Sequence, residues 1–224
     1  MSRLCTYIMI EDAGLAPNPF GVWCTLALCT PNHQHTSARE KGDWIAGFFG
    51  KKHELAHKLV YAMELFEKEI QMDDYYQRPD FQYKKPKENG TAIEQVGDNI
   101  YFKNNGELGV HGGWNPHAGN EKADIKYGIV FVAKKFWYFG KEAVDIPEKL
   151  RALIPNGRGT RINHDRELVK EFREWVENGC GNGIKPGKHG DPLNFVSTGT
   201  ESLACPGICN KTGTTQLNPQ KIGC

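Results

Sequence analysis

The chain has 224 residues, of which 28 are basic and 27 are acidic, so its net charge is +1. Proteins that grip long duplex DNA through many phosphates usually carry a clear basic excess, and this balance therefore argues against extensive binding to a duplex backbone. A single nucleotide or one flipped-out base stays compatible with it, because a pocket needs only local charge. The composition, 39% hydrophobic and 25% charged, is that of a globular chain.

The N-terminal residues predict a strand rather than a targeting segment. They contain one arginine and a short apolar run, which differs from the apolar core of a signal peptide. The apolar stretches are also far shorter than a bilayer span requires. We therefore expect a cytoplasmic protein without a membrane partner.

Strands dominate the first third of the chain. An apolar run at 4–10 predicts the first strand, and 22–29 predicts the second, which Pro31 ends. A Gly-Asp turn opens a third strand within 41–50, and 58–66 predicts a fourth, so these two are expected to form a hairpin.

The remainder of the chain predicts three helices and two more strands. Short helices are expected at 73–78 and 148–154, and short strands at 97–102 and 127–133. The clearest helix is 165–177, whose apolar residues fall on one face, with Asp165 placed as its N-cap and Gly179 as its C-cap.

The order of these elements shows no regular alternation of strand and helix. A doubly wound parallel sheet is therefore excluded in favour of an α+β fold, a small bent mixed β-barrel with peripheral helices. We expect one domain over residues 1–183, followed by an irregular, cysteine-containing tail at 184–224. The sequence does not indicate the oligomeric state.

Seven cysteines do not suggest a disulfide framework, because their number is odd and no secretory signal precedes them. The four in the last quarter of the chain offer a structural zinc site as one alternative and free thiols as the other. Their spacing is not that of a zinc ribbon, so we expect neither a metal nor another cofactor. These four residues are Cys180, Cys205, Cys209 and Cys224.

The densest group of polar and aromatic residues lies between Asp12 and Gly47. Asn18 is held between two prolines, and its amide could read a base edge or close an Asx turn. Aromatic side chains could stack on a base, or could simply pack in the core. The candidate ligand-binding residues are Asn18, Trp23, Thr25, Arg39, Trp44, Tyr61, Tyr138, Arg158 and Arg161.

The common catalytic fingerprints are absent, including the P-loop, the His-Glu-x-x-His motif and the Gly-x-Ser-x-Gly elbow. Candidate catalytic groups are Cys24, Asp12 and Asp43. Cys24 has no evident base beside it in sequence, so an inert buried thiol is the alternative. The arginines of 157–164 precede a predicted helix and suggest an anion site, or else a solvated loop.

Several of these stretches resemble the nucleotide modification associated domain 2 family over residues 4–183. They are Asp12-Ala-Gly-Leu-Ala-Pro-Asn-Pro-Phe-Gly-Val-Trp-Cys-Thr-Leu-Ala-Leu-Cys-Thr-Pro31, Gly42-Asp-Trp-Ile-Ala-Gly47, Lys58-Leu-Val-Tyr-Ala-Met63, Phe136-Trp-Tyr-Phe-Gly-Lys-Glu-Ala143 and Gly157-Arg-Gly159. The family is associated with nucleic-acid base modification in bacteria and phages, and the Gly-Asp-Trp-Ile strand is similar to PUA-like barrels.

The resemblance implies a domain that binds a nucleotide or a modified nucleobase and acts in base modification or phage defence. The expected partner is a nucleotide or a flipped nucleobase. Two alternatives stay open: an enzyme that modifies a nucleobase or nucleotide, and a sponge that sequesters a nucleotide immune signal.

Overall fold

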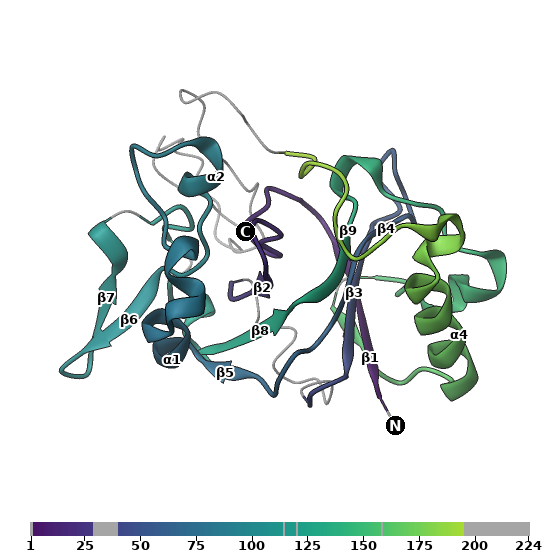
Figure 1. Ribbon diagram of the computed structural model, residues 1–224, viewed down its shortest axis with the longest axis horizontal. Helices are drawn as coiled ribbons and strands as arrows, with labels where there is room; N and C mark the ends of the chain where they lie inside the picture. Colours follow the sequence, from purple (N-terminus) through teal and green to yellow (C-terminus); the bar gives the residue numbers. More distant parts are fainter. Residues whose placement is uncertain (1, 29–39, 114, 120, 158, 195–224) are drawn as a thin grey trace, which may run out of the picture.

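The computed structural model describes residues 2–28, 40–113, 115–119, 121–157 and 159–194. Over these residues the fold is mixed α+β, with several sheets and few helices (Figure 1). The strands are β1 (Leu4–Met9), β2 (Cys24–Leu26), β3 (Trp44–Phe49), β4 (Leu59–Glu64), β5 (Ile70–Gln71), β6 (Tyr101–Asn104), β7 (Glu107–Val110), β8 (Ile129–Ala133), β9 (Lys135–Tyr138), β10 (Thr160–Arg161) and β11 (Gly187–Lys188).

Four α-helices and several short 3₁₀ segments complete the described part. The α-helices are α1 (Met72–Gln77), α2 (Ala92–Gln95), α3 (Glu121–Asp124) and α4 (Arg166–Glu177). The 3₁₀ segments are η2 (Pro79–Lys84), η3 (His111–Gly113), η4 (Gly140–Glu142) and η5 (Glu148–Leu153), and a π-type turn, η6 (Gly179–Gly183), follows α4.

The largest sheet has six strands in the order β10-β1-β3-β4-β9-β11. β1 and β3 are parallel, whereas β3, β4 and β9 are antiparallel neighbours, which confirms the predicted hairpin between β3 and β4. Over the described residues this sheet ends in the edge strands β10 and β11 and closes no barrel. The mixed α+β class is therefore confirmed, while the barrel is not.

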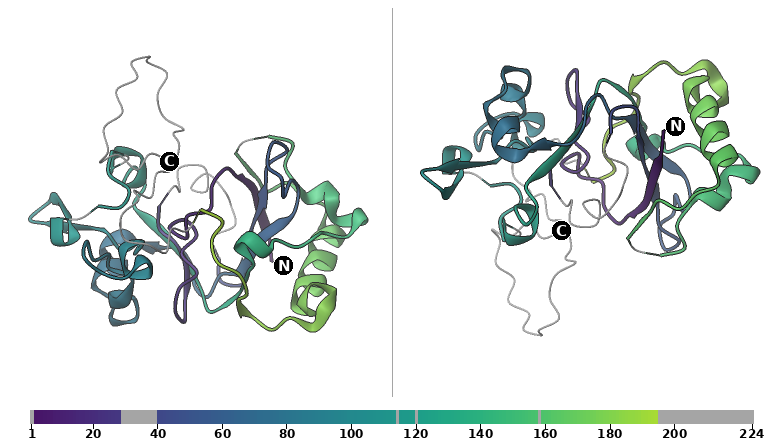
Figure 2. Two further views of the ribbon diagram at one scale, coloured as in Figure 1. Left: turned by 90° about the horizontal axis from the view of Figure 1, so that it is seen from above. Right: turned by 90° about the horizontal axis from the view of Figure 1, so that it is seen from below.

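The second sheet, β2-β8-β5, joins the first through a single strand, because only Lys134 separates β8 from β9. Figure 2 shows this long strand leaving the large sheet and passing into the smaller one. Its side-chain alternation changes phase at Lys134: Phe131 and Ala133 face the same core as Phe136 and Tyr138. The strand accommodates one extra residue at this point, as a β-bulge does, and both halves of the bent strand face a shared interior.

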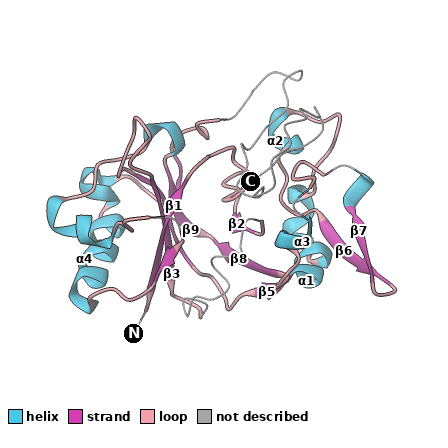
Figure 3. Ribbon diagram, turned by 180° about the vertical axis from the view of Figure 1, so that it is seen from behind, coloured by secondary structure: helices cyan, strands magenta, loops and turns pink. Residues whose placement is uncertain are grey.

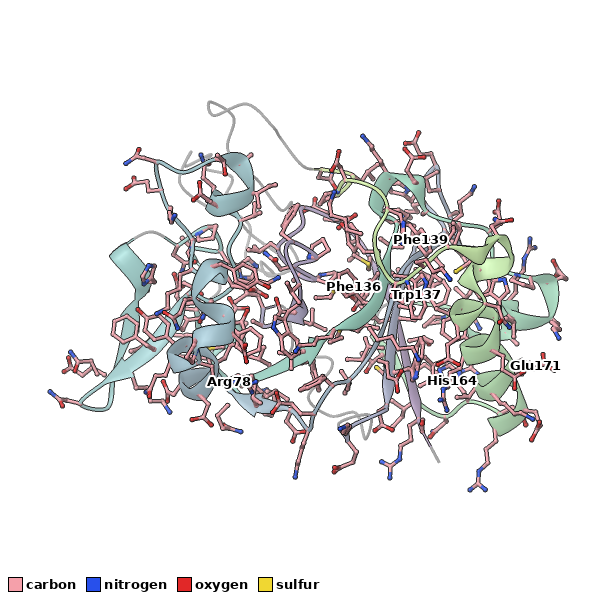
Figure 4. All side chains as sticks on the ribbon, viewed as in Figure 1. Arg78, Phe136, Trp137, Phe139, His164 and Glu171 are labelled. Atoms are coloured by element: carbon pink, nitrogen blue, oxygen red, sulfur yellow. The ribbon has the colours of Figure 1, made fainter. Side chains whose placement is uncertain are left out.

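Three cores stack across the molecule. In the first, α4 and η5 cover one face of the large sheet, where Trp137 and Phe139 point toward them (Figure 4). The central core lies between the opposite face and β2–β8, and Phe136 points into it. The third core lies between β8 and the layer of α1 and η2. The two-stranded sheet β6–β7 lies on the outer side of α1, at the end of the molecule away from the large sheet (Figure 3).

Helix α4 forms where the periodicity predicts it. The Asp165 carboxylate accepts hydrogen bonds from the backbone N–H groups of Glu167 and Leu168, as an N-cap should. The C-cap is Asn178, and Gly179 follows with φ 72°, a left-handed conformation that suits glycine. The apolar face of the helix buries Val169, Phe172 and Val176 against the sheet, as its spacing predicts.

Other boundaries differ from the sequence expectations. The second strand is only the three residues of β2, and the strand predicted at 97–102 starts four residues later as β6. The helix expected at 148–154 is present as the 3₁₀ helix η5. Residues 187–188 of the predicted tail form β11 and add to the large sheet. In the described part of the chain, no helix is long and apolar enough to cross a membrane.

Candidate functional site

A pocket of about 390 Å³ opens where the parallel strands β1 and β3 end. The two strands end level, because Met9 pairs with Phe49; a bend follows β1 and a turn follows β3. The third wall comes from the segment before β10, which pairs with β1 on its other side. The pocket is lined by Ile8, Met9, Ile10, Gly50, Lys51, Lys52, His53, Pro155, Asn156 and Gly157.

The lining of this pocket combines apolar residues with basic ones. Lys51 and Lys52 are exposed, and the lining contains no carboxylate. The imidazole of His53 stacks on the ring of Phe49 with 4.1 Å between the ring centroids. Its Nδ1 accepts the backbone N–H of Leu55 at 3.0 Å, so the neutral ring carries its proton on Nε2. The pocket therefore suits an anion.

Beside the pocket, three tyrosines form a transverse row on the central-core face of the large sheet. The strand registers place Tyr7, Gly47, Tyr61 and Tyr138 side by side on β1, β3, β4 and β9. The hydroxyl groups of Tyr7 and Tyr61 are 2.9 Å apart. A Cβ on Gly47 would lie 2.6 Å from both Met9 Sδ and Tyr61 Cε1, so the glycine leaves room for the tyrosine ring.

Asp12 ends this row. Its Oδ1 accepts the hydroxyl hydrogen of Tyr138 at 2.5 Å, and its Oδ2 accepts the backbone N–H of Leu193 at 3.2 Å. The backbone of Asn194 also bonds to the backbone of Asp12, so residues 193–194 cover the carboxyl group. Burial raises the pKa of Asp12 to about 6, although these hydrogen bonds oppose the shift.

Cys24 faces the same core and is fully buried. Burial raises the pKa of its thiol to about 12. At neutral pH the sulfur is therefore protonated, and in this conformation it lacks the thiolate character that a nucleophile needs.

A second buried polar cluster surrounds Lys84, a residue that no sequence motif singles out. Its Nζ donates to Asn18 Oδ1 at 2.6 Å, to Asn18 O at 2.9 Å and to Trp23 O at 2.8 Å. Burial lowers the pKa of Lys84 to about 8, and the nearby Asp98 opposes that shift. The Asp98 carboxylate accepts hydrogen bonds from Thr25 Oγ1 at 2.6 Å and from the Tyr75 hydroxyl at 2.7 Å.

This cluster ties the loop before β2 to η2. Asn18 also donates from its amide to Val96 O at 2.8 Å, and its backbone pairs with that of Thr25. The amide is thus engaged in holding the loop, which is the structural alternative to base reading.

The remaining candidates lie apart from the tyrosine row. Trp44 is fully buried on the opposite face of the sheet, stacked on Trp137 at 5.9 Å between ring centroids. Asp43 accepts the backbone N–H groups of Arg3 and Glu40 and closes a turn. Arg161 is exposed and donates to Ala152 O at 2.7 Å, and Trp23 packs edge-to-face on Phe66 in the third core layer.

Five of the candidate residues lie outside the described residues: Arg39, Arg158, Cys205, Cys209 and Cys224. Cys180 is a buried free thiol. Over the part of the chain that the structure describes, no group of three or more His, Cys, Asp or Glu side chains could hold a metal ion.

The structure therefore brings together Asp12, Cys24, Tyr61 and Tyr138, but not Trp44 or Asp43. The pocket residues Lys51, Lys52 and His53 were not selected from sequence, because a lysine-rich turn usually indicates a solvated loop. The signal available in the sequence was their position directly after a predicted strand, whereas the parallel pairing of that strand with β1 emerges only from the structure.

The sequence model described as nucleotide modification associated domain 2 matches residues 1–199. This match covers both the tyrosine row and the pocket, and it confirms the resemblance carried by the motifs at 12–21, 42–47, 58–63 and 136–143. The chain matches no curated protein and no solved structure.

Proposed function

The chain belongs to the nucleotide modification associated domain 2 family, and from this premise we propose that it binds a nucleotide in the pocket at the ends of β1 and β3. The observation that carries the proposal is a pocket with two lysines and a histidine, and without a carboxylate, at the carboxyl ends of two parallel strands. In open α/β sheets, ligands bind outside the carboxyl ends of the parallel strands, and by analogy we place the ligand at the corresponding end of the parallel pair β1–β3.

The size and chemistry of the pocket support a nucleotide. Its volume of about 390 Å³ lies within the range of about 300–1,000 Å³ that is typical of small-molecule sites. Lys51 and Lys52 would provide positive charge for the phosphate, for which lysine is a frequent partner. Ile8, Met9 and Pro155 would give the nucleobase an apolar wall, and the Nε2–H of His53 would donate to a base edge or a phosphate oxygen.

The proposal covers free nucleotides and modified nucleobases, and it places the protein in nucleic-acid base modification or phage defence. The proposal also includes a PUA-like origin for the bent large sheet. The Gly-Asp turn that opens β3 supports this origin.

Equilibrium binding to a panel of deoxynucleoside monophosphates, including hypermodified bases, tests the proposal. The charge-reversal pair Lys51→Glu and Lys52→Glu should weaken binding on the order of ten-fold or more, since hydrogen bonds to charged groups contribute about 1.5–3 kcal/mol each. The matched control is Lys170→Glu with Lys185→Glu, two exposed lysines distant from the pocket in sequence and not among its lining residues. Equal affinity in both variants, or no nucleotide bound more tightly than millimolar, contradicts the proposal.

One observation favours an enzyme as the second candidate. A buried carboxyl with a pKa of about 6, hydrogen-bonded to a tyrosine, has the properties of a general acid or base. Mass spectrometry of nucleotides and phage DNA after incubation with the protein separates the candidates. Altered products that disappear in Asp12→Asn support an enzyme, whereas a bound nucleotide that is recovered unaltered after denaturation supports binding or a sponge.

A further inference from the structure

A second surface with chemistry suited to nucleic acid lies at the other end of the large sheet. Phe66 follows β4, which runs antiparallel to β3, so it lies near the start of β3 and not near the pocket. The five residue steps of β3 separate the two ends by about 17 Å. A mononucleotide in the pocket is too far away to contact Phe66, and the two sites can be tested separately.

Apolar and aromatic side chains are exposed together on this surface. Val22 is 67% exposed, Tyr83 48% and Phe66 41%. They are contiguous, because Trp23 packs edge-to-face on Phe66 at 4.9 Å between centroids and its backbone N–H donates to the Tyr83 hydroxyl at 3.2 Å. We call these residues, with Lys41 and Lys134, the Phe66 surface.

Two lysines flank the exposed ring. Lys134 Nζ lies 5.1 Å from the centroid of Phe66 and 4.5 Å from that of Trp23, and Lys41 Nζ lies 5.7 Å from Phe66. Lys134 can reach both rings because it occupies the exposed position where β8 meets β9.

Neither lysine forms an ion pair with a carboxylate in the described part of the chain. The neighbouring acid Glu67 is paired with Arg78 at 2.6 Å, and Glu64 is paired with Lys135 at 2.8 Å. The ammonium groups of Lys41 and Lys134 therefore stay unpaired beside the ring, over the described residues.

Exposed aromatic rings beside free lysines match single-stranded nucleic acid, whose bases stack on rings while its phosphates meet cations. A duplex hides its base faces and offers only phosphates. We propose that the Phe66 surface binds a single strand of DNA or RNA, with an unpaired base on Phe66 and adjacent phosphates on Lys41 and Lys134. The site is distinct from the nucleotide pocket and does not depend on it.

Fluorescence anisotropy of a labelled oligothymidylate of about ten nucleotides tests this site. Lys41→Glu with Lys134→Glu should weaken binding on the order of ten-fold or more. Replacing the lysines by Gln should reduce the slope of log affinity against log salt by about 1.4, which is about 0.7 for each lost phosphate contact on a single strand. Phe66→Leu should also weaken binding on the order of ten-fold, whereas Phe66→Trp should preserve it. Both substitutions keep an apolar side chain, but only Trp keeps an aromatic face on which a base can stack.

The control pair Lys170→Glu with Lys185→Glu should leave oligothymidylate affinity unchanged. Mononucleotide affinity should also stay unchanged in the Phe66 surface variants, so failure of the pocket proposal and failure of this one are separate results. The inference is overturned by absence of oligothymidylate binding, by equal affinity for a blunt duplex, by equal competition from poly-L-glutamate, or by Phe66 and lysine variants that bind like the control.

Discussion

Replacing Asp12 by Asn should change how the stability of the protein depends on pH. The pKa of Asp12 is raised from 3.8 to about 6, chiefly by burial, so the folded state holds its proton over a range where the unfolded state has lost it. Stability from this group therefore falls as pH rises from about 4 to about 6 and is level above that range. The rise in this pKa from 3.8 to about 6 corresponds to about 3 kcal/mol over the full range of pH.

Asn cannot ionise, so the variant lacks this pH-dependent loss, although its amide can satisfy only one of the two donors, Tyr138 and Leu193. Urea unfolding followed by tryptophan fluorescence at pH 4, 5, 6 and 7 gives the comparison. The free energy of unfolding of the wild type minus that of Asp12→Asn should fall by about 2 kcal/mol from pH 4 to pH 7, since at pH 4 the unfolded carboxyl is already more than half ionised. Other titrating groups contribute equally to both proteins and cancel. A difference that is constant, or that rises with pH, would refute the assignment of a buried, destabilised carboxylate.

Three further substitutions test other parts of the interior. Lys84→Met should lower the free energy of unfolding in urea by about 3–5 kcal/mol, because it leaves Asp98 buried without its cation; a loss below 1 kcal/mol contradicts this. Gly47→Ala should cost about 1–3 kcal/mol, because the new Cβ meets the Tyr61 ring, and a melting temperature equal to wild type argues against that clash. Burial, aided by the nearby Arg161, lowers the pKa of His164 to about 4, so the free energy of unfolding should rise with pH from about 4 to 6.5. This rise should vanish in His164→Asn. If the rise persists in that variant, another group causes it.

The elements that sequence predicts well are those whose own residues carry the signal. β1, β3 and β4 are apolar runs bounded by turn residues, and α4 has both an apolar face and an N-cap. The two-residue strands β10 and β11 carry no such pattern, because they exist only through pairing with β1 and β9. Segment 148–154 has the composition of a helix, yet its Leu150 and Leu153 pack on the sheet as 3₁₀ turns.

The sequence predicts some of the residues of the polar interior, but not the hydrogen-bond partners of these residues. Asp12 and Tyr138 were both selected, but their hydrogen bond joins residues 126 positions apart. Asn18 and Thr25 were selected as ligand contacts, whereas the structure engages them with Lys84 and Asp98, a cluster that only the packing of η2 against β2 creates. Long-range pairing of this kind leaves no periodic trace in the sequence.

The phase change at Lys134 constrains how the protein can vary. Deleting this one exposed residue would place Phe131, Ala133, Phe136 and Tyr138 in strict alternation on the central-core face and would remove the bulge at which β8 bends into β9. For folding, the position should therefore accept many side chains, while its presence sets the bend between the two sheets. A surface residue of free composition would then control the angle between two buried layers.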